Sequence, residues 1–89
     1  MNMEQAADHQ KQPLPLPLTR GDKGVAVLEL QAQLAALGWL IVATGEYDLA
    51  TERVVQEFQK ASRLKVTGMV DAETRERIKT YYQWNRKDH

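Results

Sequence analysis

The chain contains two copies of one short pattern, and this repeat limits the folds that are open to it. The segments TGEYDLATER, from Thr44, and TGMVDAETRER, from Thr67, align at an offset of 23 residues. The matched pairs are Thr44 and Thr67, Gly45 and Gly68, Asp48 and Asp71, and Thr51 and Thr74. Glycine allows a tight turn, aspartate bonds turn amides, and threonine favours a helix start. The sequence therefore predicts two units, each a turn followed by a helix.

Apolar residues recur at helical spacing in three segments. The first helix is expected between Asp22, as N-cap, and Gly38, while Thr51 and Thr74 are expected to cap the second and third helices. The expected core consists of Val27, Leu30, Leu34, Leu37, Val55, Phe58, Leu64 and Ile78. We predict an all-α fold, a compact three-helix bundle with two glycine-containing turns. Because they are β-prone, segments 40–42 and 64–70 leave open a short hairpin-like pairing between the turns.

A length of 89 residues allows one small domain. We assign residues 1–12 to a flexible polar tail, 13–18 to a Pro-rich linker, 19–84 to the domain and 85–89 to a second flexible tail. Pro13, Pro15 and Pro17 favour a stiff, extended linker, with a proline-recognition ligand as the alternative.

Residues that catalyse reactions or bind metals are scarce. The sequence has no cysteine, its histidines are His9 and His89 near the chain ends, and its one serine is Ser62. We therefore predict no enzyme activity, no metal site and no cofactor.

The charge balance and the apolar runs bear on the partners. Twelve Lys and Arg match twelve Asp and Glu, and this net charge of +0 argues against nucleic-acid binding through charge. No apolar run approaches the ~20 residues that cross a bilayer, and the first residues lack the apolar stretch of a secretory signal. We predict neither membrane insertion nor a signal peptide within this sequence.

The ordered series of motifs resembles the peptidoglycan-binding domain of the three-helix type, over about Leu18 to Ile78. That module is appended to bacterial cell-wall amidases, lytic transglycosylases, L,D-transpeptidases and phage endolysins. The landmarks here are Gly21, Gly24, Val27, Leu30, Gln31, Leu34, Leu37, Gly38, Trp39, Gly45, Tyr47, Asp48, Thr51, Val55, Phe58, Gln59, Leu64, Gly68 and Thr74. The chain departs from the family at Thr44, where aspartate is usual, at Tyr47, where Phe is usual, and at Asp48, where glycine is frequent.

The resemblance implies non-catalytic binding of cell-wall peptidoglycan. A monomer of this kind would target an attached or associated wall-lytic, wall-remodelling or secretion protein, acting at the cell wall or in the periplasm. The candidate ligand-binding residues are Trp39, Tyr47, Asp48, Gln59, Arg63 and Asp71.

Each candidate also has a structural interpretation. We expect Trp39 to be a lid on the core, with a sugar platform as the alternative, and the Tyr47 ring to be buried. Asp48 and Asp71 are expected to brace their own turns, and contacts with ligand amides are the alternative.

The remaining candidates lie on or after the predicted helices. The resemblance implies that Gln31 and Gln59 pack and bond the connecting loops. Lys60, Arg63 and Lys65 complement the negative end of a helix, or they meet wall carboxylates or phosphates.

Aromatic residues continue past the usual end of the family. Either Trp84 folds back on the core, which we expect, or Tyr81, Tyr82 and Trp84 form a partner surface. The second arrangement would make the domain a protein–protein adaptor or oligomerisation module, which is the alternative function.

Overall fold

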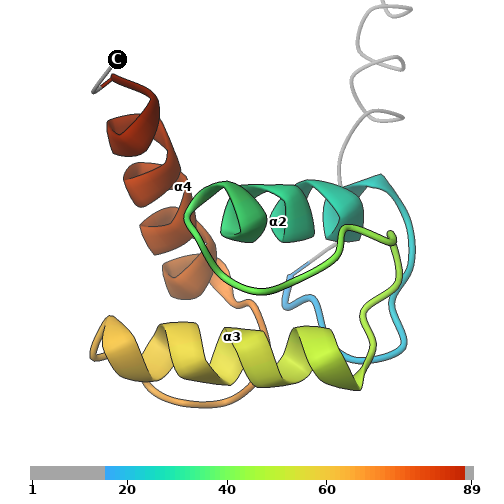
Figure 1. The fold of residues 1–89 in the computed structure, drawn as a ribbon. Coiled ribbons are helices and arrows are strands. Elements are labelled where there is room, and N and C mark those ends of the chain that lie inside the picture. The colour runs from blue at the N-terminus through green and yellow to red at the C-terminus, as the bar shows by residue number, and fades with distance from the viewer. Residues whose placement is uncertain (1–15, 88–89) are drawn as a thin grey trace, which may run out of the picture.

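The computed structural model describes residues 16–87, which form three helices. These are α2 (Val25–Ala36), α3 (Leu49–Ala61) and α4 (Ala72–Lys87). Figure 1 shows α2 lying above α3, with α4 crossing both near their C-terminal ends. No strand occurs among the described residues, so the predicted all-α fold is confirmed. The predicted tail of residues 1–12 and the first half of the linker lie outside the described part.

Aspartates, not threonines, cap α3 and α4. A carboxylate oxygen of Asp48 accepts a hydrogen bond from the Thr51 amide at 2.9 Å, and Asp71 accepts one from the Thr74 amide at 2.8 Å. The predicted N-caps at Thr51 and Thr74 are therefore wrong, because both threonines lie inside the first helical turn. The repeat still marks two helix starts, three residues earlier than predicted.

The first helix, in contrast, begins later than predicted. Gly24 is the N-cap of α2, and no side chain caps that end. Asp22 accepts a hydrogen bond from the Thr19 amide at 2.8 Å instead, so it closes the turn that precedes α2. The prediction of Asp22 as the N-cap is wrong for this reason.

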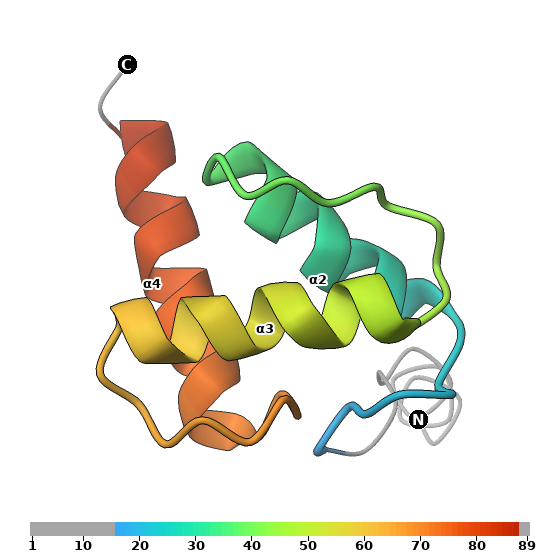
Figure 2. The same cartoon turned by 60° about the horizontal axis from the view of Figure 1, so that its bottom comes forward.

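The segment before α2 pairs with both repeated turns. Leu18 forms an antiparallel bridge with Val70, and Lys23 forms one with Glu46. Figure 2 shows the segment before α2 running beside the loop that precedes α4. The turns are thus held by the segment 18–24, and the hairpin-like pairing between them that the sequence left open is absent from the described residues.

The core lies where the three helices and this segment meet. Its buried apolar residues are Leu18, Ala26, Val27, Leu30, Leu34, Tyr47, Val55, Phe58, Val70 and Ile78. The predicted core is confirmed except at Leu37 and Leu64, which lie half-buried at its edge. Leu18 was assigned to the linker, yet it is fully buried, so the folded unit begins before Thr19.

The ends of α2 and α3 share one hydrogen-bond pattern. The Trp39 and Leu64 amides each donate to a carbonyl five residues earlier, at 3.0 and 2.8 Å. The residue before each amide has a positive φ, 100° at Gly38 and 60° at Arg63. Glycine suits this position, whereas the Cβ of arginine is crowded there.

The last helix is longer than predicted. α4 runs to Lys87, so residues 85–87 of the predicted flexible tail are helical, while 88–89 lie outside the described part. Trp84 is 67% exposed, so the prediction that it folds back on the core is wrong. Tyr81 does pack inward, with its ring centroid 5.9 Å from that of Phe58. None of the described helices is long and apolar enough to span a membrane.

Candidate functional site

Two buried glutamines hold the repeated turns. Gln31, on α2, accepts a hydrogen bond from the Gly45 amide at 2.8 Å through its carbonyl oxygen. Its Nε2 donates to the Glu46 carbonyl and to the Thr51 hydroxyl, both at 2.9 Å. One side chain therefore joins α2, the first turn and the start of α3.

Gln59 repeats this arrangement one helix later. Its carbonyl oxygen accepts from the Gly68 amide at 2.9 Å, and its Nε2 donates to the Met69 carbonyl at 2.9 Å and the Thr74 hydroxyl at 3.1 Å. The loop-bonding role expected of Gln31 and Gln59 is confirmed by these contacts.

Two of the six candidate residues have no free surface. Tyr47 is 1% exposed and its hydroxyl donates to the Gly68 carbonyl at 2.6 Å, while Gln59 is fully buried. Burial raises the pKa of the Tyr47 phenol, with smaller contributions from nearby carboxylates, so the side chain stays neutral. A ligand cannot reach either side chain, and both stabilise the fold instead.

The two aspartates among the candidates are helix caps. The Thr51 amide, followed by the Thr51 hydroxyl, lowers the pKa of the Asp48 carboxyl. The Thr74 amide has the same effect on the pKa of Asp71. The expectation that each aspartate braces its own turn is confirmed, and both stay ionised at neutral pH.

Trp39 and Arg63 follow the C-terminal ends of α2 and α3. Trp39 is half-buried and packs edge-on against Phe58, with ring centroids 6.0 Å apart, which confirms the expected lid. Arg63 is exposed after the end of α3, whereas Asp48 caps its start. A 13-residue helix separates these two, about 20 Å along its axis, so the candidates do not form one site.

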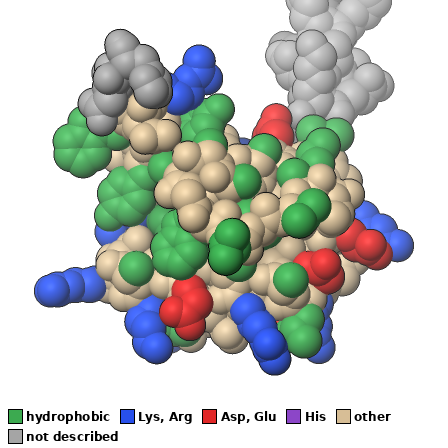
Figure 3. Space-filling model, viewed as in Figure 1, with side chains coloured by type: hydrophobic (Ala, Val, Ile, Leu, Met, Phe, Trp, Pro, Cys, Tyr) green, Lys and Arg blue, Asp and Glu red, His purple; other side chains and the backbone are tan. Residues whose placement is uncertain are grey.

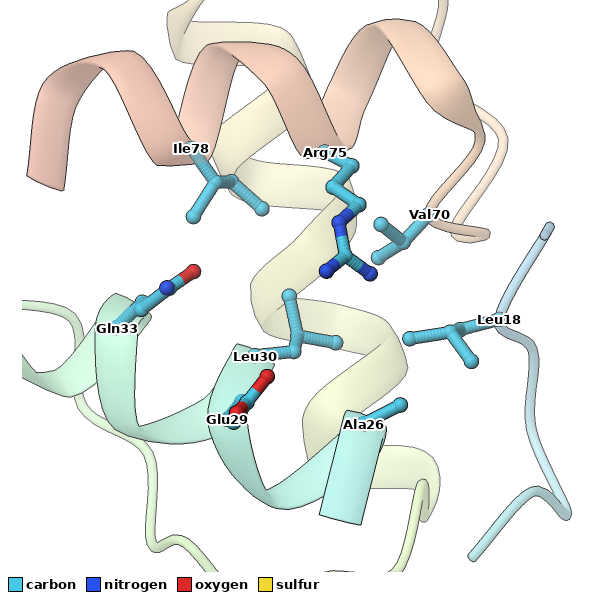
Figure 4. Close-up of a pocket in the computed structure, with 8 residues that line it drawn as sticks. All are labelled: Leu18, Ala26, Glu29, Leu30, Gln33, Val70, Arg75 and Ile78. Atoms are coloured by element: carbon cyan, nitrogen blue, oxygen red, sulfur yellow. The ribbon is translucent and has the colours of Figure 1, made fainter. Parts of the chain in front are cut away.

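A groove between α2 and α4 brings polar side chains together instead. At one end it narrows to a hollow of about 10 Å³, room for one water molecule. Figure 4 shows Leu30 and Ile78 pointing toward each other there, with the guanidinium of Arg75 above Leu30. Glu29 and Gln33 stand beside this hollow on α2.

The groove widens toward the C-terminal end of α4. A hollow of about 460 Å³ is lined there by Gln33, Lys79, Tyr82, Gln83 and Arg86. The Arg86 guanidinium lies 5.7 Å from the centroid of the Tyr82 ring, a distance at which cation and ring attract each other. Gln33 lines both hollows, so they form one surface.

We call this surface the α2–α4 groove. Above an apolar floor that includes Leu30 and Ile78, its polar and aromatic residues are Glu29, Gln33, Arg75, Lys79, Tyr82, Gln83 and Arg86. It offers three cations, two carboxamides and one phenol around a shallow depression, against one carboxylate. Such a lining suits an extended ligand that carries carboxylates and amides. Within residues 16–86, no group of three or more His, Asp or Glu side chains is placed to hold a metal ion.

The residues of the α2–α4 groove were not among the candidates predicted from the sequence. A signal was present, because residues 75, 79, 82 and 86 are spaced three or four apart and therefore share one face of a helix. Their partners on α2, Glu29 and Gln33, are about fifty residues earlier, and only the crossing of the two helices brings them together.

Comparisons with known proteins agree on the fold. A family model described as "Putative peptidoglycan binding domain" matches residues 23–78, more than half of the chain. A sequence comparison with curated proteins finds no match.

Three solved structures resemble the chain closely. The SleB N-terminal domain is 25% identical, with a TM-score of 0.73 over 80% of this chain and 99% of its own. An L,D-transpeptidase from Xylanimonas cellulosilytica DSM 15894 is 38% identical, with a TM-score of 0.71 over 79% of this chain and 35% of its own. A fused Zn-dependent amidase/peptidase/peptidoglycan-binding domain-containing protein from Clostridium acetobutylicum ATCC 824 is 26% identical, with a TM-score of 0.69 over 73% of this chain and 29% of its own. The chain thus spans about a third of the transpeptidase and less of the amidase.

Proposed function

The chain belongs to the peptidoglycan-binding domain family, and on this premise we propose that it attaches to bacterial cell-wall peptidoglycan without modifying it. In this role it holds a fused or associated wall-lytic, wall-remodelling or secretion protein at the wall or in the periplasm. Two of the structural relatives are wall enzymes that are longer than this domain, which supports such a division of labour. Weak binding suffices, because tethering raises the local concentration of the partner.

The α2–α4 groove carries the contact in this proposal. Peptidoglycan joins amino-sugar strands through short peptides that present carboxylates and amides. Lys79 and Arg86 are exposed and would meet the carboxylates, while Gln33 and Gln83 would bond the peptide amides. This polarity is the single observation that carries the assignment of the surface.

A second surface competes for the same role. Arg63 lies with Lys60 and Lys65 around the end of α3, and all three side chains are exposed. Trp39, Asp48 and Asp71 remain secondary contact candidates, each on its own loop or helix start. We favour the α2–α4 groove because it is hollowed and mixes cations with carboxamides, as an extended peptide requires.

The proposal assigns no catalysis to this chain. Hydrolysis of a glycan usually needs one carboxyl group with a raised pKa to act as an acid, whereas the pKa values of Asp48 and Asp71 are lowered. We expect purified sacculi to keep their turbidity when this chain alone is added. A steady loss of turbidity would show that the chain is a hydrolase.

Co-sedimentation with purified sacculi tests the binding. We expect the folded domain in the pellet at low salt and less of it there as salt rises, because ionic contacts are screened. The heat-unfolded chain and sacculi-free samples are the controls. Recovery of the folded domain entirely in the supernatant at low salt would refute the proposed function.

A protein–protein adaptor is the second candidate, and the exposure of Trp84 favours it. Our proposal predicts a monomer at all concentrations in sedimentation equilibrium. Self-association that Trp84→Ala removes, together with no binding to sacculi, would support the adaptor instead.

A further inference from the structure

The part of α4 beyond the family match helps to line a third hollow, which is separate from the α2–α4 groove. The match ends at residue 78, and α4 continues to Lys87. A hollow of about 300 Å³ is lined by Leu37, Tyr81, Trp84 and Asn85, which we call the aromatic shelf. Figure 3 shows hydrophobic side chains gathered over the C-terminal part of α4 and the loop after α2.

The aromatic shelf is held in position from both helices. Tyr81 is fixed edge-on against buried Phe58, with ring centroids 5.9 Å apart. The Asn85 amide donates to the Ala36 carbonyl at 3.4 Å, a long bond that joins α4 to the end of α2. Trp84 stands at the rim with 67% of its surface exposed. A large indole is therefore presented to solvent by a fixed support rather than by a loop.

The four side chains that line the aromatic shelf indicate which kind of ligand it would bind. All four side chains are uncharged, unlike the neighbouring α2–α4 groove with Lys79 and Arg86. An uncharged hollow has no cation to pair with a ligand carboxylate. The indole face packs against apolar C–H groups, and the phenol and the carboxamide form hydrogen bonds with hydroxyls and amides. A pyranose ring with an N-acetyl group offers this combination of an apolar face and a polar edge.

We propose that the aromatic shelf binds an N-acetylated hexosamine ring of the glycan strand, with Trp84 stacked on the sugar face. This inference rests on the proposed function and assigns the glycan to the aromatic shelf and the peptide to the α2–α4 groove. The hollow of about 300 Å³ is shallow and open, which suits one face of a single sugar ring. A protein partner would need about 800 Å² of contact, far more than four side chains supply.

A titration with the N-acetylglucosamine hexamer, which carries no peptide, tests the aromatic shelf. We expect NMR shift changes at the Trp84 indole and the Asn85 amide group, and Trp84→Ala should weaken binding at least about tenfold. Trp84→Phe should restore most of the affinity. Leu40→Ala is the matched control, because Leu40 is 95% exposed and lies outside the aromatic shelf. An unchanged circular dichroism spectrum will show that each variant is folded.

The outcomes separate this inference from the proposed function. No shift at Trp84 under saturating hexamer, with sacculi still bound, overturns the aromatic shelf alone. Hexamer binding that depends on Trp84, with no binding to sacculi, supports the aromatic shelf and overturns the proposed function. Equal loss of hexamer binding in Trp84→Ala and Leu40→Ala, or self-association through Trp84, also overturns the aromatic shelf.

Discussion

Gln59 in α3 donates through Nε2 to the hydroxyl of Thr74 in the first turn of α4, across 3.1 Å and with both side chains buried. Gln31 bonds Thr51 in the same way at 2.9 Å. In each repeat, the threonine in the first turn of the helix bonds a buried glutamine of the preceding helix, and this bond joins the two helices. In a domain this small the apolar core is modest, so such bonds matter for stability.

The first prediction concerns the buried carboxamide of Gln59. Gln59→Met keeps the length of the side chain but removes the acceptor of the Thr67 and Gly68 amides and the donor to the Met69 carbonyl. We expect a loss of about 3 kcal/mol in the free energy of unfolding, because buried unpaired groups cost about 1–3 kcal/mol each. Urea unfolding followed by circular dichroism measures the change.

Gln83→Met is the matched control for that measurement. Gln83 is exposed on α4, so the same chemical change should alter stability by no more than about 0.5 kcal/mol. Equal unfolding midpoints for the two variants would contradict the role of Gln59.

The sequence carried enough information for the helices and most of the core. Apolar residues at helical spacing report burial directly, which is why Val27, Leu34, Val55 and Phe58 were assigned correctly. The caps were misplaced because Asp and Thr are both good N-cap residues and occur three positions apart in each repeat. The cap is the residue whose side chain accepts a hydrogen bond from an amide of the first helical turn. The spacing of Asp and Thr in the sequence does not show which of the two does so.

The candidate site was less accessible from the sequence. Tyr47 and Gln59 were selected as ligand contacts, although one closes the core and the other bonds a turn. The α2–α4 groove depends on the crossing of two helices, which periodicity within each helix does not specify. Trp84 was expected to fold back on the core, but α4 continues as a helix to Lys87 and leaves Trp84 exposed.

The second prediction concerns the turn before α4. Gly68 has a φ of 81°, and a Cβ there would lie 3.1 Å from the Glu52 Cγ and 3.2 Å from the Gln56 Nε2. Gly21 has a φ of 102°, and a Cβ added there would have no other atom within 4 Å. Gly68→Ala should therefore destabilise the domain by about 1 kcal/mol more than Gly21→Ala in urea unfolding. An equal or larger loss at Gly21 would show that crowding at Gly68 is unimportant.

The third prediction concerns the left-handed residue after α3. Arg63→Gly removes the crowding at a φ of 60° and should stabilise the domain by about 0.5–1 kcal/mol in thermal unfolding. Lys60→Gly lies in the last turn of α3 and should destabilise it by a similar amount. A destabilised Arg63→Gly would mean that the arginine side chain makes a contact of its own.

The fourth prediction concerns acid sensitivity at Asp71. The Thr74 amide lowers the pKa of this carboxyl below its usual value of about 4, so the ionised form stabilises the fold above that pH and the effect fades as pH falls through the folded pKa. Asp71→Ala should cost about 1 kcal/mol at pH 7, and its difference from the parent should shrink below about pH 4. Asp71→Asn keeps the accepting oxygen and should lose less. Urea unfolding at a series of pH values measures this, and a difference that stays constant down to pH 2 would disprove it.

The most direct test of the binding surface is a pair of charge reversals measured by co-sedimentation with sacculi. Lys79→Glu with Arg86→Glu changes the α2–α4 groove, and Lys60→Glu with Lys65→Glu makes the same change of charge at the end of α3. We predict that the first pair weakens binding at least about tenfold and that the second changes it no more than about twofold. Full binding by the first pair and a loss in the second would contradict the assignment and move the site to the end of α3.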